Sequence, residues 1–437
     1  MNRAMIRSLT RFLSAALVFL AALPAAAGIQ IEHWNTAAGA RVQFVPSRGL
    51  PMLDVQVDFA AGSMFDPAGK SGLAALTRAL LDLGAGSRDE TAIAEELADI
   101  GAQLGGGADT DRASLSLRTL AAPDKRAIGI DILRSVIAQP RFDPRILERE
   151  KERTIAALKE AMTRPDSIAG KAFWAALYPG HPYGRQATPE SLAALERGDL
   201  LAFHAAYYTA ANASITLVGD LSRQEAEQIA EQISSSLPAG QPAALPPPPA
   251  AGKGGVTAIA HPATQAHIYL GTPAIERGHP DFFPLLVGNY TLGGGGFVSR
   301  LMKEVRDKRG YAYSVYSYFS PLKQAGPFQI GLQTKRSQAK EAIKVARDVL
   351  DRFLAEGPGE DELAAAKANL TGSFPLRLDS NRKILDNVAL IGFYGLPLDY
   401  LDHYQERVRA VTAAEIKAAF ARHVKPDALT VVTVAAD

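Results

Sequence analysis

The spacing of apolar and polar positions predicts an alternation of strands and helices in the first half of the chain. Residues 29–45 and 53–59 alternate with period two, which indicates paired strands, and residues 113–119 and 213–218 show the same strand pattern. Apolar positions recur at helical spacing in residues 71–83, 91–104, 123–138, 144–162, 192–208 and 224–237. Glycines 105–107 are expected to break the second of these helices.

The alternation of strands and helices stops after residue 238 and begins again after residue 254. Residues 239–254 are almost entirely Pro, Gly and Ala, which is typical of a linker. Beyond the linker, a helix at 415–420 and a strand at 428–434 repeat the order of 199–204 and 213–219, and helices are expected at 339–354 and 360–370. We therefore expect an α+β fold with two tandem homologous domains, residues 28–238 and 255–437, because 437 residues exceed what one core usually supports.

One stretch of the second domain, residues 288–320, carries the clearest chemical signal. Four glycines, Gly293 to Gly296, precede an amphipathic run that starts at Phe297 and a charged turn that ends at Gly310. An aromatic strand follows, so a short turn would bring Arg306 and Tyr313 together. Alternation along that strand would put Tyr311, Tyr313 and Val315 on one face and Ala312, Ser314 and Tyr316 on the other.

Glycine runs are weak motifs, and three interpretations of this one stay open. The run could be a flexible loop that contacts an extended peptide, a helix N-terminus that receives an anion, or a loose surface loop. A phosphate-binding P-loop is disfavoured because no Lys-Ser/Thr pair follows the glycines.

The string GGGGFVSRLMKEVRDKRGYAYSV resembles the C-terminal half of pitrilysin/insulysin-type zinc peptidases, which include the mitochondrial processing peptidase. In that family an Arg and a Tyr seven residues apart bind the substrate backbone near the scissile bond and support the transition state. Arg306 and Tyr313 fall on those positions. The resemblance also implies substrate contact by Gly293, Gly294, Gly295 and Gly296, and two α/β-roll domains that form a clamp around a cavity.

The family's inverted zinc motif, H-x-x-E-H on a helix, is absent at the matching positions. Its two His bind the metal from one helix face, and its Glu activates the metal's water. Here Ala75 and Ala79 stand at the His positions and Arg78 at the Glu position, while the distal ligand position holds Lys159, one residue before Glu160. Alanine cannot bind a metal and arginine repels one, so no metal site is expected in this chain.

Composition argues against several other kinds of site and partner. The eight histidines form no H-x-x-x-H or similar local pair, and the chain has no G-x-S-x-G elbow and no cysteine. Without the first 27 residues, 44 Lys and Arg stand against 46 Asp and Glu, which gives no electrostatic case for nucleic acid or an anionic membrane.

Residues 1–27 have the form of a signal peptide, with Arg3, Arg7 and Arg11, an apolar stretch over 12–23, and small residues after Pro24. This segment predicts export to the periplasm, with an uncleaved anchor as the alternative. No later stretch is long and apolar enough to span a bilayer.

A chain with the Arg/Tyr pair but without the zinc motif resembles the non-catalytic subunits of this family's two-component members, so the resemblance implies the non-catalytic subunit of a heterodimeric zinc peptidase. A zinc-motif homologue of similar size would supply the metal, and Arg306 and Tyr313 would hold unfolded or short peptides. The alternative is a structural or peptide-binding pseudo-peptidase with no role in turnover. A third possibility, an independent metallopeptidase, would need zinc ligands from unexpected positions.

Overall fold

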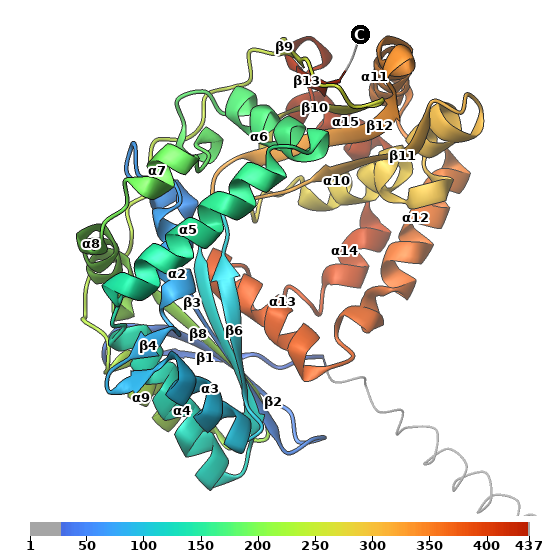
Figure 1. The fold of residues 1–437 in the computed structure, drawn as a ribbon. Helices are drawn as coiled ribbons and strands as arrows, with labels where there is room; N and C mark the ends of the chain where they lie inside the picture. Colours follow the sequence, from blue (N-terminus) through green and yellow to red (C-terminus); the bar gives the residue numbers. More distant parts are fainter. Residues whose placement is uncertain (1–27, 436–437) are drawn as a thin grey trace, which may run out of the picture. The chain divides into compact units, whose positions relative to one another are not determined.

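The computed structural model describes residues 28–435, so the predicted signal peptide lies outside the described residues. From Ile31 onward the described chain forms one compact unit that contains two large β-sheets and the helices that cover them (Figure 1). Among the described helices, none has the length and apolar character needed to cross a membrane.

The first sheet has the strand order β1-β2-β8-β3-β7-β6. Its strands are β1 (Glu32–Asn35), β2 (Arg41–Pro46), β3 (Met52–Phe59), β6 (Gln103–Ala108), β7 (Ala113–Leu120) and β8 (Ala213–Gly219). β8 runs parallel to β2, and the other neighbours are antiparallel. A separate small ribbon pairs β4 (Gly84–Ala85) with β5 (Arg88–Asp89).

The second sheet repeats this arrangement. Its strands are β9 (Gly255–Ile259), β10 (Gln265–Ile275), β11 (Ala312–Phe319), β12 (Gly326–Lys335) and β13 (Thr430–Val434). Read from β9, their order is β9-β13-β10-β12-β11, with β13 parallel to β9 and the other pairs antiparallel. Apart from β1, the two sheets therefore have one topology, as the faint sequence repeat predicts.

The helices of the first half are α2 (Leu73–Leu80), α3 (Glu90–Asp99), α4 (Pro123–Ala138), α5 (Pro144–Ala161), α6 (Pro165–Leu177), α7 (Pro189–Ala193), α8 (Arg197–Tyr207) and α9 (Arg223–Ser234). Those of the second half are α10 (Phe282–Asn289), α11 (Ala339–Glu356), α12 (Glu360–Gly372), α13 (Asn381–Tyr394), α14 (Tyr404–Ala410) and α15 (Ala413–His423). Capping boxes begin α9, at Ser222 and Glu225, and α15, at Thr412 and Glu415.

The short helical turns are η1 (Ser63–Phe65), η2 (Pro182–Gly184), η3 (Ala210–Asn212), η4 (Tyr290–Gly294), η5 (Gly296–Val298), η6 (Met302–Asp307), η7 (Arg336–Gln338), η8 (Phe374–Arg377) and η9 (Pro426–Ala428). Two of them, η4 and η6, are π-helical, and both lie in the stretch that carries the chemical signal.

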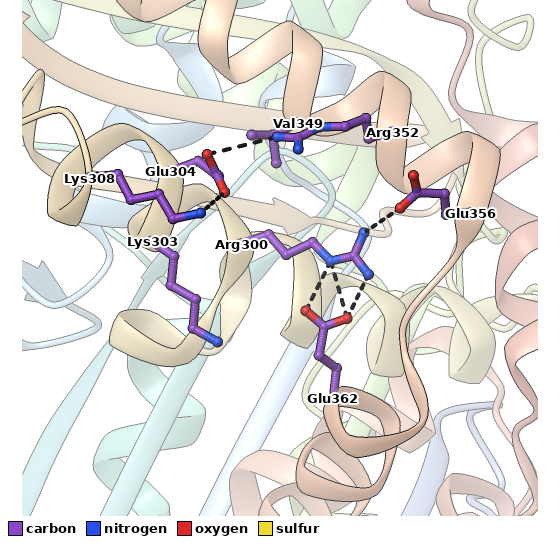
Figure 2. Close-up of a pocket in the computed structure, with 8 residues that line it drawn as sticks. All are labelled: Arg300, Lys303, Glu304, Lys308, Val349, Arg352, Glu356 and Glu362. Carbon is purple, nitrogen blue, oxygen red and sulfur yellow. Dashed lines mark hydrogen bonds and ion pairs between the residues drawn. The ribbon is translucent and has the colours of Figure 1, made fainter.

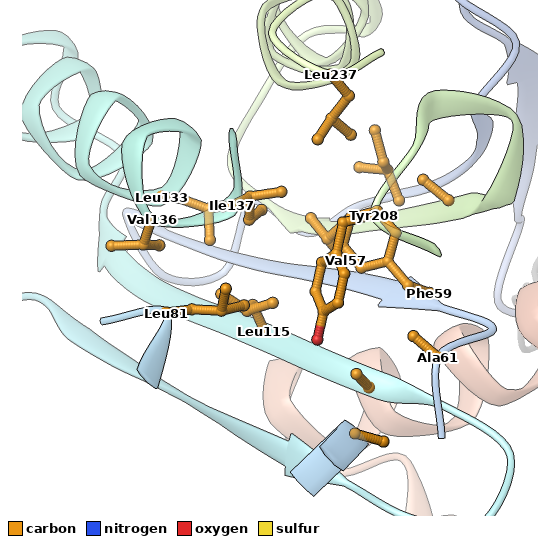
Figure 3. Packing of buried hydrophobic residues seen from close by; sticks show 14 of the residues in the cluster. Val57, Phe59, Ala61, Leu81, Leu115, Leu133, Val136, Ile137, Tyr208 and Leu237 are labelled. Atoms are coloured by element: carbon orange, nitrogen blue, oxygen red, sulfur yellow. The ribbon is translucent and has the colours of Figure 1, made fainter. Parts of the chain in front are cut away.

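One face of the first sheet forms the main hydrophobic core. Alternate residues such as Val57 of β3 and Leu115 of β7 point into it and are fully buried (Figure 3). Tyr208, just after α8, packs on Phe59 with ring centroids 4.7 Å apart. Apolar and polar residues alternate along these strands, as the sequence pattern predicted, but both faces of β3 and β8 are buried.

Each half also contributes a helix to the other half's sheet. α6 packs against β10 and β13, and α13 packs against β2, β3 and β8. Glycines permit both approaches: a Cβ at Gly271 would lie 2.7 Å from the Phe173 ring, and one at Gly392 would collide with the Gln43 side chain. The halves are therefore joined by exchanged helices as well as by the linker.

Hydrogen bonds to one buried carboxylate connect the two halves. Asp111, on the β6–β7 turn, accepts hydrogen bonds from the hydroxyls of Tyr183 and Tyr394, each at 2.8 Å. It also accepts one from the backbone N–H of Lys323 at 2.8 Å. Burial raises the pKa of Asp111, and its hydrogen bonds oppose that shift.

The linker lies along both halves. Ala243 N–H donates to Asn212 of the first half at 3.0 Å, and Gln324 of the second half donates to the carbonyl of Pro246. His181 lies 3.1 Å from the carbonyl of Pro247 through its Nε2.

Two segments differ from the predicted elements. Residues 91–104 were expected to be one helix, but α3 ends at Asp99 and the glycines 105–107 belong to edge strand β6. Residues 192–208 divide into the end of α7 and α8, because a second capping motif starts at Glu196. Glycines hide the strand pattern in β6, since they have no side chain that could alternate.

Candidate functional site

Arg306 and Tyr313 come together, as their spacing predicted. The Arg306 guanidinium carbon lies over the Tyr313 ring, 5.5 Å from its centroid, within the range of a cation–π contact. On its other flank it lies 4.9 Å from the centroid of Phe297. Tyr313 is 86% exposed and Phe297 is 68% exposed, so the three side chains form a surface cluster around one cation.

The chain reaches this arrangement through a tight turn between η6 and β11. Gly310 has φ +63° and donates its N–H to the carbonyl of Arg306 at 2.8 Å, and Tyr311 N–H donates to Val305 at 2.9 Å. The register with β12 then shifts between Ala312 and Ser314. This bulge turns Tyr313 outward while Val315 is buried, so the prediction that these two share a face is wrong.

Glu304 organises the charged part of the same turn. Its carboxylate accepts hydrogen bonds from Lys308 and Arg309, each at 2.7 Å, and these lower its pKa to about 2. Figure 2 shows Glu304 at one side of a pocket of about 290 Å³, with Arg300 and Glu362 paired on the other side at 2.6 Å. The side of η6 that faces this pocket is therefore built from ion pairs.

The four glycines are part of a folded segment, and three of them are tightly surrounded. A Cβ at Gly293 would lie 2.7 Å from the Leu301 side chain, and Cβ atoms at Gly294 and Gly295 would lie 2.7 Å from Asn289 and Tyr290. Gly296 has φ +62° and open space at the Cβ position. Packing therefore explains Gly293–Gly295, and of the four only Gly296 is both exposed and in a left-handed backbone conformation.

The amphipathic run expected from Phe297 is interrupted. Ser299 is extended between η5 and η6, with ψ 155°. Leu301, Met302 and Val305 are buried as predicted, but Phe297 and Val298 are exposed. This break in the helix lies between Phe297 and Arg306, and the Phe297 ring contacts the Arg306 guanidinium across it.

Helix α2 carries the positions of the missing zinc motif. Ala75 and Ala79 lie exposed on its outer face, and Ala75 lines a pocket of about 330 Å³. Asp66 accepts the N–H groups of Gly72 and Ala74 at 2.7 Å and so caps the helix, while burial raises its pKa to about 6.

Arg78 points into the protein. The residue is 5% exposed, and its guanidinium donates to the carbonyls of Ser114 at 2.6 Å and Gly105 at 2.7 Å. It also reaches Asp82 at 3.3 Å. The position that holds a base in the zinc motif therefore holds a cation that connects α2 to β6 and β7.

These positions do not fit a zinc ion. Two methyl groups and a guanidinium offer no ligand atom, and Lys159 is exposed on α5 beside an equally exposed Glu160. Within residues 28–435, the group with metal-ligating geometry is His279, Asp281 and His423 of the second half. The carboxylate of Asp281 is already paired with both Arg422, at 2.7 Å, and His423, at 2.8 Å.

Sequence reasoning missed Phe297 and Glu304. Phe297 has the position of the first apolar residue of a helix, and Glu304 is not singled out by the sequence pattern. The spacing of Glu304 to Lys308 at i+4 is a signal that could have indicated its role.

Comparison with known proteins agrees with this geometry. The family model for insulinase (peptidase family M16) matches residues 50–189, and that for the peptidase M16 inactive domain matches residues 194–370. A crystal structure of a peptidase M16 inactive domain from Pseudomonas fluorescens is 39% identical with a TM-score of 0.89, over 93% of this chain and 98% of that one.

The curated relatives carry two kinds of description, a non-peptidase homolog and an uncharacterized zinc protease. The non-peptidase homolog YmxG of Helicobacter pylori is 26% identical over 87% of this chain and 88% of its own length. An uncharacterized zinc protease of Streptomyces coelicolor is 34% identical over 40% of each chain.

The chain thus belongs to the M16, or insulinase, family of peptidases. Within that family it resembles proteins described as inactive domains and as a non-peptidase homolog, which supports a pseudo-peptidase.

Proposed function

We propose that this chain is the non-catalytic subunit of a two-subunit periplasmic zinc peptidase. The observation that carries the proposal is the convergence of Arg306 and Tyr313 on an exposed surface, in a chain whose zinc-helix positions offer no ligand atoms. A partner of similar size with an intact zinc motif would supply the metal and its activated water. The export segment at residues 1–27 is the basis for the periplasmic location.

In this proposal Arg306 binds the carbonyl oxygen of an extended peptide. A guanidinium has five N–H donors and keeps its charge at every physiological pH. The Phe297 and Tyr313 rings flank the cation, which limits its freedom before substrate arrives. The Tyr313 hydroxyl has no hydrogen-bond partner among residues 28–435, so it is free to donate to the developing oxyanion.

The test is reconstitution with a zinc-motif homologue from the same cell. We expect no peptide hydrolysis by this chain alone, and hydrolysis together with a heterodimer peak in size-exclusion chromatography after mixing. Arg306→Ala should lower kcat/KM by about 10²- to 10³-fold, the range for loss of one oxyanion donor. Arg145→Ala, at a side chain 93% exposed on α5, is the control and should change nothing.

A structural or peptide-binding role without turnover is the second candidate. The exposed Phe297 and Tyr313 favour it, because aromatic rings on a surface can hold a peptide without any chemistry. Under this candidate, Arg306→Ala leaves turnover by the assembled pair unchanged. Stoichiometric, tightly bound zinc in the purified chain would contradict both candidates.

A further inference from the structure

A second pocket, of about 380 Å³, lies where the start of β2, the linker and the β11–β12 connection meet. Its walls include Met64, Phe65 and Phe393, which are buried, and Pro242 and Leu245 of the linker. This volume is in the range that holds a small organic molecule. None of its lining residues belongs to the cluster of Phe297, Arg306 and Tyr313.

Two cations, Arg41 and Lys323, face this pocket from opposite halves of the chain. Within residues 28–435, neither side chain makes a hydrogen bond or an ion pair. The Lys323 ammonium lies 5.9 Å from the centroid of the Phe393 ring. Burial and the neighbouring Arg41 guanidinium lower the pKa of Lys323, whereas the charges of Asp111 and Glu276 raise it. The Arg41 side chain is exposed to solvent.

The carboxylates nearby are already engaged. Asp58 is fully buried, and its carboxylate accepts hydrogen bonds from the Ser114 hydroxyl and the Gln56 amide. It also forms an ion pair with Arg112 at 3.4 Å. Asp111 accepts the two tyrosine hydroxyls and the Lys323 N–H described above. Asp111 also lines the pocket, and its charge acts on Lys323 as that of Asp58 acts on Arg41. The pocket therefore presents two cations that repel each other and that no carboxylate pairs with directly.

We propose that this pocket binds a small organic carboxylate whose apolar body packs on Met64, Phe65 and Phe393. The carboxylate lies between Arg41 and Lys323. It relieves their mutual repulsion and accepts charge-assisted hydrogen bonds from both. The ligand chemistry is shared by free apolar acids and by the C-terminus of a peptide with an apolar last residue. The proposal does not depend on the role of Arg306 and Tyr313.

The first test is calorimetric titration of the full mature chain with N-acetyl-L-leucine and with its neutral analogue, N-acetyl-L-leucinamide. The acid should bind with one-to-one stoichiometry and at least about tenfold more tightly than the amide, because a charged hydrogen bond contributes about 1.5 kcal/mol or more. Equal binding of acid and amide, or no binding up to about 10 mM acid, overturns the proposal.

Variants locate the binding. Lys323→Met keeps the aliphatic stem and the backbone contact to Asp111, and Arg41→Gln keeps a polar side chain. Each should weaken acid binding by about tenfold. Lys340→Met, at an exposed lysine of α11 outside the pocket, should leave it unchanged. Unchanged affinity in both pocket variants contradicts the assignment, and if neither variant folds, the acid and amide comparison decides alone.

A third titration distinguishes the two sources of the carboxylate, free apolar acids and peptide C-termini. The peptide Ala-Ala-Ala-Leu with a free C-terminus is compared with the same peptide amidated. Binding of the free form alone assigns peptide C-termini as ligands, whereas binding of N-acetyl-L-leucine without the peptide assigns free small acids.

Discussion

Arg78 takes the place of the glutamate of the zinc motif, and its contacts give it a structural role. Its guanidinium reaches two backbone carbonyls on different strands, at Gly105 and Ser114. Because Arg78 is buried, those carbonyls would lose their charged donor if the side chain were shortened.

We therefore expect Arg78→Ala to lower the free energy of unfolding by about 2 to 4 kcal/mol, since hydrogen bonds to a charged group contribute about 1.5 to 3 kcal/mol each and are not additive. Urea denaturation monitored by circular dichroism measures this. Ala79→Gln, at an exposed position of the same helix, is the control and should stay within about 0.5 kcal/mol. A loss below about 0.5 kcal/mol for Arg78→Ala would contradict the role.

Individual residues were predictable where local spacing carries the information. Arg306 and Tyr313 are close in sequence, so one turn was enough to bring them together. The partners of Arg78 lie 27 and 36 residues away, and no local pattern marks them. The bulge at Tyr313 was also hidden, because alternation assumes an unbroken register.

At the scale of elements, η6 and its turn depend on Glu304. The folded-state pKa of Glu304 is about 2, below that of an unpaired glutamate, because Lys308 and Arg309 stabilise the charged form. The stability contributed by Glu304 is therefore present above the usual glutamate pKa and is lost as the pH falls towards 2.

Glu304→Gln should lower the free energy of unfolding at pH 7 by about 0.5 to 1 kcal/mol, a value discounted because solvent screens ion pairs near the surface. The difference between the variant and the parent should shrink between pH 5 and pH 3, as thermal unfolding would record. Glu152→Gln, at an exposed position within α5 that makes no hydrogen bond or ion pair with residues 28–435, is the matched control. A constant difference across this range would mean that Glu304 acts through packing alone.

Elements with strong helical spacing were predicted well. Residues 123–138 coincide with α4, and 144–162 with α5, because a proline begins each and the apolar positions repeat at helical intervals. The strand β6 was not predicted, because its three glycines have no side chains that could show the alternation of a strand. The two π-helical turns were unpredictable, since they accommodate packing around Gly293 and Val305 that only the folded chain defines.

At the scale of the molecule, the exchanged helices make each half a part of the other's packing. α6 and α13 lie on the opposite sheets, and Asp111 adds hydrogen bonds from both sides. Several of these contacts join distant segments, such as Asp111 and Tyr394, which are 283 residues apart. Sequence patterns therefore suggested two domains but gave no sign of the exchange.

Cutting the linker should therefore leave the molecule assembled. A protease site inserted between Pro248 and Pro249 and then cleaved should give two fragments that elute together in size-exclusion chromatography and unfold in one transition. The uncut variant is the control for the insertion itself. Separate elution of the fragments in native buffer would contradict this interdependence.

The exchange also has a consequence for the order of synthesis. The first sheet is complete at Gly219, but α13, which covers one of its faces, ends 175 residues later at Tyr394. At ribosomal rates of about 5 to 20 residues per second, that face waits roughly 10 to 35 s for its cover. The buried residues on it include Gln43, Ser116 and Thr216. Because these side chains are polar, the uncovered face exposes less apolar surface to water during synthesis than the opposite, core-forming face would.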